Sequence, residues 1–217
     1  MRASRCGATS VSCRRYNERV LRWFQKWLAE QATGGELGRD VRALGHPRPG
    51  MDLSGRDLRG VELINASMRH SQLDGADLSR ADLFGIDLRN SQLSNARLHE
   101  TNLYRADLTR ANLQQANLSD ANLREAKLDG ADLRKACLVS TCLVGAWLDG
   151  ADLRGVQFFT TVPIPGRPTP EPAVLTGASL RGTRLEGVDL RRVDLRGVAM
   201  DGVQSNALTR WPPGRMR

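Results

Sequence analysis

Leucine recurs at every fifth position through the middle of this chain. From Leu53 to Phe158 the central position is filled in 22 consecutive units without a slip, and only Met68 and Phe158 are not leucine. The residue two positions earlier is small, alanine in 13 of the 22 units, and the residue between them is usually Asp or Asn. A repeat that keeps its phase from 51 to 160 indicates a repeat architecture before any local element is considered.

A step of five suits neither regular secondary structure. On an α-helix the leucines would wind around every side, and on a flat strand alternate leucines would face water. The chain must therefore turn a corner once per unit, so that every leucine points at one axis. This predicts a solenoid, in which each buried leucine contributes roughly 1.5–3 kcal/mol to a core that no single unit could form.

The pattern, as in Ala76-Asp77-Leu78 and Ala111-Asn112-Leu113, resembles the pentapeptide-repeat family, whose units read A(D/N)LXX. The resemblance implies an all-β solenoid, a right-handed quadrilateral β-helix with four units per coil. Six further centres, from Leu175 to Met200, bring the total to 28 and imply about seven coils. Residues 20 apart should then stack at about the 4.8 Å spacing of neighbouring strands.

Proline marks the boundaries of the repeats. All nine prolines lie outside 51–160, as expected if the coils need their backbone N–H groups. The predicted parts are a disordered basic tail (1–16), an amphipathic helix and linker (17–50), the repeat coil (51–160), a proline-rich projecting loop (161–172), the continued coil (173–203) and a C-terminal tail (204–217).

The predicted helix at 17–31 has an apolar face that leaves two interpretations open. Val20, Leu21, Phe24, Trp27 and Leu28 share one side of it. One interpretation is an end cap over the open core, which solenoids require. The other is a basic amphipathic helix that docks on a membrane surface or a partner. The sequence contains neither a secretory signal nor a long apolar run, so a cytoplasmic protein is expected.

The net charge of +8 lies at the ends of the chain. Residues 51–160 carry 13 Lys/Arg against 15 Asp/Glu, whereas 1–50 carry 10 against 4 and 161–217 carry 9 against 5. A protein that follows phosphates needs a continuous basic surface, so direct nucleic-acid binding is not expected. Family members that protect DNA gyrase or topoisomerase IV from quinolones or toxins were proposed to mimic DNA through strongly acidic towers, and this near-neutral coil departs from them.

No constellation for catalysis, a cofactor or a metal is recognisable. The three histidines are scattered, and the four cysteines lack zinc-site spacing. Cys137 and Cys142 occupy equivalent positions in successive units and should project from adjacent faces as free thiols. The repeated Asp and Asn residues are interpreted as backbone-bonding groups of the corners. We therefore predict a protein that is not an enzyme and has no cofactor.

Large apolar residues stand where the repeat should be polar. In the position after each centre, residues 20 apart read Ile64, Phe84, Tyr104, Arg124 and Val144, which predicts an apolar ladder on the outside. Packing of the N-terminal helix or the C-terminal tail over such a ladder is the alternative. The predicted partner-binding residues are Ile64, Phe84, Tyr104 and, in the loop, Ile164 and Arg167; those predicted for self-association as a homodimer are Val139, Val144, Trp147 and Phe159.

These features favour a protein-binding scaffold. The resemblance gives its most specific form, a protein that binds a type II topoisomerase, DNA gyrase or topoisomerase IV, and so confers resistance to a drug or toxin. The alternative is a membrane-associated adaptor or effector that uses the basic N-terminal helix.

Overall fold

The computed structural model describes residues 47–160 and 171–214. The chain divides into two units, Met1–His46 and Pro47–Arg217. The predicted basic tail and helix, and the loop residues Ile164 and Arg167, lie outside the described residues. Within the described part, no helix is long and apolar enough to cross a bilayer.

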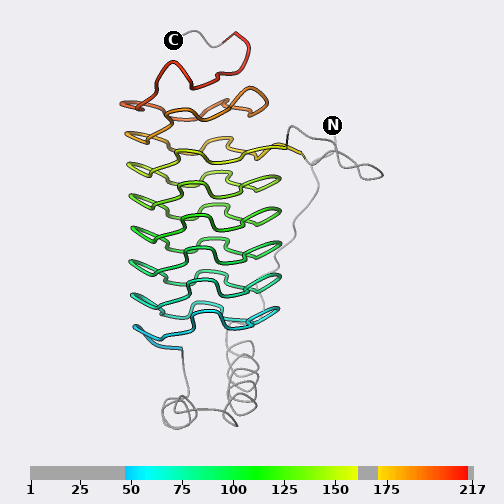
Figure 1. Ribbon diagram of the computed structural model, residues 1–217, viewed down its shortest axis with the longest axis vertical. Helices are drawn as coiled ribbons and strands as arrows, with labels where there is room; N and C mark the ends of the chain where they lie inside the picture. The colour runs from blue at the N-terminus through cyan, green and yellow to red at the C-terminus, as the bar shows by residue number, and fades with distance from the viewer. Residues whose placement is uncertain (1–46, 161–170, 215–217) are drawn as a thin grey trace. The chain divides into compact units, whose positions relative to one another are not determined.

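The described repeats form a stack of coils (Figure 1), and the bridge pattern gives each coil four sides. Each side contributes a single residue, the one before the centre, which forms a parallel bridge to the residue 20 positions along. Asp82, for example, bridges Asn102, which in turn bridges Asn122. Twenty residues per coil correspond to four units of five, as the resemblance implied. Within 47–160 and 171–214 the structure has these isolated bridges in place of helices or continuous strands.

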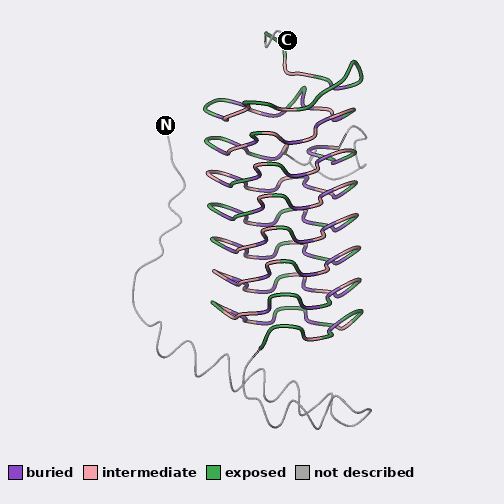
Figure 2. Cartoon of the chain, turned by 90° about the vertical axis from the view of Figure 1, so that its left-hand side faces the viewer, coloured by how far each residue is buried: buried purple, intermediate pink, exposed green. Residues whose placement is uncertain are grey.

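Main-chain hydrogen bonds join each coil to both neighbours. The N–H of Leu103 donates to the carbonyl of Asn122 at 2.8 Å, and the N–H of Asn102 donates to the carbonyl of Ala81 at 3.0 Å. The central leucines point inward; Leu78 is 1% exposed, and Leu103 and Leu128 are 0% exposed. Figure 2 shows these buried positions repeating in every coil. The predicted dry core is thus confirmed in the described coils.

A tight turn at each corner explains the residue types that follow the centre. The N–H of Ala106 donates to the carbonyl of Leu103 at 3.0 Å, and the third residue, Arg105, has φ 59°. A positive φ at this position alone is typical of a type II turn. It suits glycine, as at Gly85 with φ 61°. Other residues adopt it at a cost of about 1–2 kcal/mol, which the surrounding ladder and core offset.

The proline-rich insertion starts and ends at one corner. The N–H of Ala173 donates to the carbonyl of Phe158 at 2.8 Å, which is the bond that closes an ordinary turn. Cys142 then bridges Val174, so the coil resumes in phase on the next side. The Glu171 carbonyl accepts the N–H of Ser140 at 3.0 Å, whereas one coil earlier Asp120 uses the equivalent corner carbonyl, that of Val139. The insertion therefore lengthens one corner, and the described coils on either side of it keep their bonds.

The coil extends past the predicted boundary at 203. Gln204 bridges Arg184, and Arg210 bridges Asp189 across 21 residues, one more than the normal period. Thr209 is buried, and its hydroxyl donates to the Leu185 carbonyl at 2.9 Å. The Thr141 hydroxyl makes the same kind of bond to Leu118, at 2.7 Å. The first residues of the predicted tail are thus part of the last coil.

Replacing Leu113 by Asp should unfold the coil. The side chain is 0% exposed, so the substitution would place a charge without a partner among apolar groups. We expect loss of the β circular-dichroism signal and of cooperative melting. Gln115→Asp is the matched control, because Gln115 is exposed and Asp120 holds the equivalent position one unit later. A folded Leu113→Asp protein would contradict the assigned core.

Deleting residues 161–172 should leave the fold intact. The deletion joins Thr160 to Ala173, which makes Phe158-Phe159-Thr160-Ala173 an ordinary corner and restores the five-residue phase. We expect the free energy of unfolding to change by about 1 kcal/mol or less. Deleting 161–171 instead leaves Pro172 as one extra residue and should destabilise the last coils. Equal melting temperatures for the two deletions would show that the phase does not matter.

Candidate protein-binding surface

The side chains of the Asp and Asn residues before each centre bind the backbone of their own unit. The Oδ1 atom of Asp52 accepts the N–H of Ser54 at 3.0 Å, and that of Asn112 accepts the N–H of Gln114 at 3.2 Å. These are Asx-turns, in which a short side chain binds the backbone two residues on. The predicted corner role of these residues is confirmed.

In units that read Asp-Leu-Arg, the arginine after the centre folds back on the aspartate before the centre. Arg154 donates from Nε and a terminal nitrogen to the Asp152 carboxylate at 2.9 and 2.6 Å. Such Asp-Leu-Arg units neutralise their own charge and leave little net acidic surface. The pairs are Asp57–Arg59, Asp87–Arg89, Asp132–Arg134, Asp152–Arg154, Asp189–Arg191 and Asp194–Arg196.

Asp87 is the less exposed of two aspartates whose pKa is lowered to about 2 by pairing with arginine. Hydrogen bonds from Arg89, and then from Arg69, lower the pKa of this carboxyl from 3.8 to about 2, against an opposing effect of burial. The Asp57 carboxyl also has a pKa of about 2, through Arg59. Its side chain is 60% exposed, compared with 19% for Asp87. Water therefore screens the Asp57 pair more strongly.

The predicted apolar ladder forms one column along a corner. The bridges from Glu62 to Asp82, Asn102, Asn122 and Cys142 place the residues two positions after them directly in line. This aromatic column consists of Ile64, Phe84, Tyr104, Arg124 and Val144. The Phe84 and Tyr104 rings meet edge to face, with centroids 5.5 Å apart and an interplanar angle of 68°. Both side chains are half-buried, so each ring keeps part of its surface open.

Charged groups hold Tyr104 in place. The Arg105 guanidinium lies over the ring, 4.9 Å from its centroid, and donates to Glu125 at 2.7 Å. The Tyr104 hydroxyl donates to the same carboxylate at 3.2 Å. These bonds, the Arg105 bond foremost, lower the pKa of the Glu125 carboxyl. Sequence reasoning missed Arg105 and Glu125, although opposite charges 20 residues apart at one repeat position could have indicated them.

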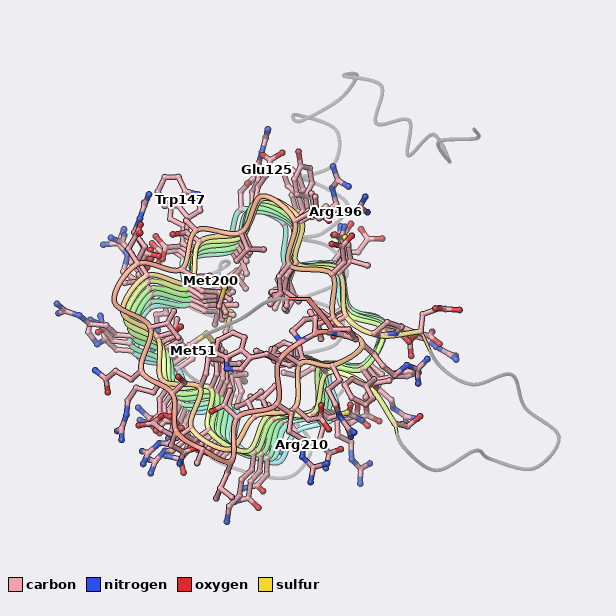
Figure 3. All side chains as sticks on the ribbon, turned by 90° about the horizontal axis from the view of Figure 1, so that it is seen from above. Met51, Glu125, Trp147, Arg196, Met200 and Arg210 are labelled. Carbon is pink, nitrogen blue, oxygen red and sulfur yellow. The ribbon has the colours of Figure 1, made fainter. Side chains whose placement is uncertain are left out.

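The four residues predicted for self-association do not form one cluster. Val139 and Phe159 are buried at 5% and 9% exposure, and the Arg192 guanidinium lies 5.4 Å from the Phe159 centroid. Val144 belongs to the aromatic column. Trp147 is 53% exposed on another side, with the Lys127 ammonium 5.6 Å from its ring centroid (Figure 3). The prediction of a single surface is wrong because successive units face different directions.

Cys137 and Cys142 are free thiols on adjacent sides, as predicted. In the part of the chain that the structure describes, no three His, Cys, Asp or Glu side chains are grouped as a metal site would require.

The repeats match an established sequence family. The family described as pentapeptide repeats matches residues 50–85, 76–115, 116–155 and 173–203, in eight copies. The chain belongs to the pentapeptide-repeat family. Proteins of this family generally act as non-enzymatic scaffolds in protein–protein interactions.

Solved structures of other pentapeptide-repeat proteins resemble this one. HetL, involved in heterocyst differentiation regulation in the cyanobacterium Nostoc, is 24% identical; the match covers 82% of this chain and 97% of HetL, with a TM-score of 0.41. Another Nostoc pentapeptide-repeat protein is 30% identical; the match covers 48% of this chain and 77% of that protein, with a TM-score of 0.42. A trypsin-treated variant of QnrB1, a plasmid-mediated fluoroquinolone resistance protein, is 19% identical. The match covers 75% of this chain and 92% of QnrB1, with a TM-score of 0.41. Among curated proteins, none matches this sequence.

Acid should destabilise the coil partly through Asp87. A carboxyl whose pKa falls from 3.8 to about 2 on folding stabilises the fold above pH 3.8, and this contribution is lost as the pH drops toward 2. We expect Asp87→Asn to lose on the order of 2 kcal/mol at pH 7 and to melt with a weaker dependence on pH between 5 and 2. Asp57→Asn, the exposed counterpart, should have a smaller effect. Identical pH profiles for wild type and Asp87→Asn would contradict this assignment.

Proposed function

We propose that this protein is a non-enzymatic scaffold that binds a partner protein along its aromatic column. The observation that carries the proposal is the Phe84–Tyr104 pair, which stands outside a core that is complete without it. Aromatic side chains supply large contact areas at protein interfaces, and their energy concentrates in a few such residues.

The surroundings of the pair support a prearranged surface. Arg105 and Glu125 fix the Tyr104 ring from two sides, and the backbone beneath is bonded to the coils on either side. Little side-chain freedom then remains to be lost on binding, which favours affinity. Most of the other outward charges bind one another or the backbone and so serve the coil itself.

The narrower form of the proposal is a type II topoisomerase as the partner. It rests on family resemblance and on QnrB1 being a fluoroquinolone resistance protein. The paired charges of this coil do not support whole-surface DNA mimicry, so the contact would involve the aromatic column and the 161–172 insertion. This form places the protein in the cytoplasm, where DNA gyrase acts.

We further propose that the coil is right-handed and that two copies associate through its C-terminal end, as the family implies. Leu208 in the last coil is 71% exposed, and Met200 is half-buried where the stack ends (Figure 3). Apolar surface of this kind favours association.

Arginine substitutions at Phe84 and Tyr104 test whether the aromatic column is the binding surface. Phe84→Arg and Tyr104→Arg should leave circular dichroism unchanged, because both side chains lie outside the core. They should weaken capture of purified DNA gyrase by about tenfold or more. Ser94→Arg, at the same repeat position on another corner, is the matched control.

A supercoiling assay with and without a quinolone then tests protection, for wild type, both variants and the 161–172 deletion. Absence of gyrase binding at micromolar protein would exclude only the topoisomerase form, and the broader proposal of a protein-binding scaffold would stand. Gyrase binding that survives both arginine variants would exclude the aromatic column as its site.

A further inference from the structure

Arg124 breaks a rule that other arginines of the described coils obey. Each other arginine that directly follows a central residue pairs with a carboxylate. The Arg124 guanidinium is exposed and makes no hydrogen bond or ion pair with the described residues. The arginines that obey the rule are Arg59, Arg69, Arg89, Arg134, Arg154, Arg181, Arg191 and Arg196.

The exception has a local cause. Arg124 follows Asn122, so the fold-back carboxylate of the Asp-Leu-Arg units is replaced by an amide. The Asn122 side chain is itself occupied: its amide nitrogen donates to Asn102 at 3.1 Å, and its Oδ1 accepts the Arg124 N–H at 3.3 Å.

Arg69 and Arg181, which also lack the aspartate of an Asp-Leu-Arg unit, pair instead with carboxylates of the next coil, 18 and 20 residues on. For Arg124 those positions hold Cys142 and Val144.

The neighbouring carboxylate does not substitute for the missing one. Glu125 already accepts hydrogen bonds from Arg105 and Tyr104. Arg124 only contributes, at longer range, to the lowered pKa of Glu125. An available cation is therefore left in the aromatic column, one coil beyond Tyr104 and one coil before Val144.

We propose that the aromatic column binds an acidic, extended segment of the partner protein. A carboxylate of that segment pairs with Arg124, and apolar side chains on either side of it contact Tyr104 and Val144. This inference rests on the proposed function and names the chemistry of its partner.

The dimensions fit an extended peptide. Three coils separate Phe84 from Val144, about 14 Å at the spacing of neighbouring strands, and an extended segment of about four or five residues covers that distance. Apolar, acidic and apolar contacts then follow one another along a single line.

The charges favour a peptide over a nucleic acid. Phosphate backbones are bound by several free cations together, because affinity grows with the number of phosphates neutralised. Arg124 is one available cation in the column, and Arg105 is held by Glu125.

Phage panning with random linear peptides tests the proposal. The full chain is the bait, and phage that also bind Tyr104→Ser are removed, because this variant lacks a contacted ring and gains no charge. The retained peptides should be enriched in Asp or Glu flanked by apolar residues. The same panning on Arg124→Glu should select Lys or Arg instead.

A synthetic peptide of the selected consensus is then measured by fluorescence anisotropy. Arg124→Gln should weaken its binding by about three- to tenfold, and added salt should reduce that difference. Asn122→Asp should weaken binding similarly although Arg124 is retained, because it recreates the Asp-Leu-Arg pair. Arg110→Glu, an exposed arginine outside the column, should bind the peptide as the wild type does.

The outcomes separate the two proposals. If no peptide survives the counter-selection, the column does not bind peptides, and the proposed function at this surface falls with the inference. If peptides survive but lack acidic enrichment, or bind equally to Arg124→Gln, only the acidic partner is wrong. Tighter, Arg124-dependent binding of a labelled oligothymidine would overturn the assignment of a protein partner.

Discussion

One main-chain bridge per side joins every coil to the next, and the rest of this structure follows from the shortness of these bridged segments. Because only one residue on each side forms a bridge, the remaining residues of a unit must turn the corner and bury an apolar group. Central leucines such as Leu103 fill the axis, and small residues such as Ala106 let the corners close. A proline among the bridged residues would remove a ladder bond, which explains why the prolines lie outside 51–160. The fold is thus the same local solution repeated, with its stability shared between neighbouring coils.

Most outward polar side chains of the described coils are engaged in hydrogen bonds within the coils themselves. Asp and Asn side chains bind the backbone two residues on, and the arginines of Asp-Leu-Arg units return to their own aspartates. Exposed pairs of this kind contribute little to stability individually, but they remove free charge from the surface. The edge-to-face ring pair, and an arginine that pairs with no carboxylate in the described coils, depart from the repeat and occur in one column. A surface that differs from its scaffold in both apolar area and charge is suited to recognition.

The 161–172 insertion shows how such a scaffold acquires new features. It lengthens the two-residue corner Phe159-Thr160, keeps the closing bond between Ala173 and Phe158, and returns the chain in phase at Val174. The Glu171 carbonyl accepts the bond that a normal corner carbonyl would accept, so the preceding coil remains bonded. Corners tolerate change because each is closed by its own hydrogen bond and makes one main-chain bond to each neighbouring coil, whereas a bridged side makes two to each. Variation for function is therefore expected at corners, where the aromatic column also lies.

The five-residue phase alone determined the solenoid and the inward leucines, because a strict period converts sequence distance into spatial distance. The alignment of Phe84 with Tyr104 also required the four units per coil that the family resemblance implied. Equivalent positions in successive units also allowed Cys137 and Cys142 to be assigned to adjacent sides. Only the tertiary structure decided which outward groups are engaged. It showed that Val139 and Phe159 are buried and separated from Trp147, that the last coil reaches Arg210, and that Arg105 binds Glu125 while Arg124 binds none of the described carboxylates. These outcomes depend on side-chain contacts between coils and around corners, where a single Asp-to-Asn difference redirects an arginine and leaves the repeat pattern unchanged.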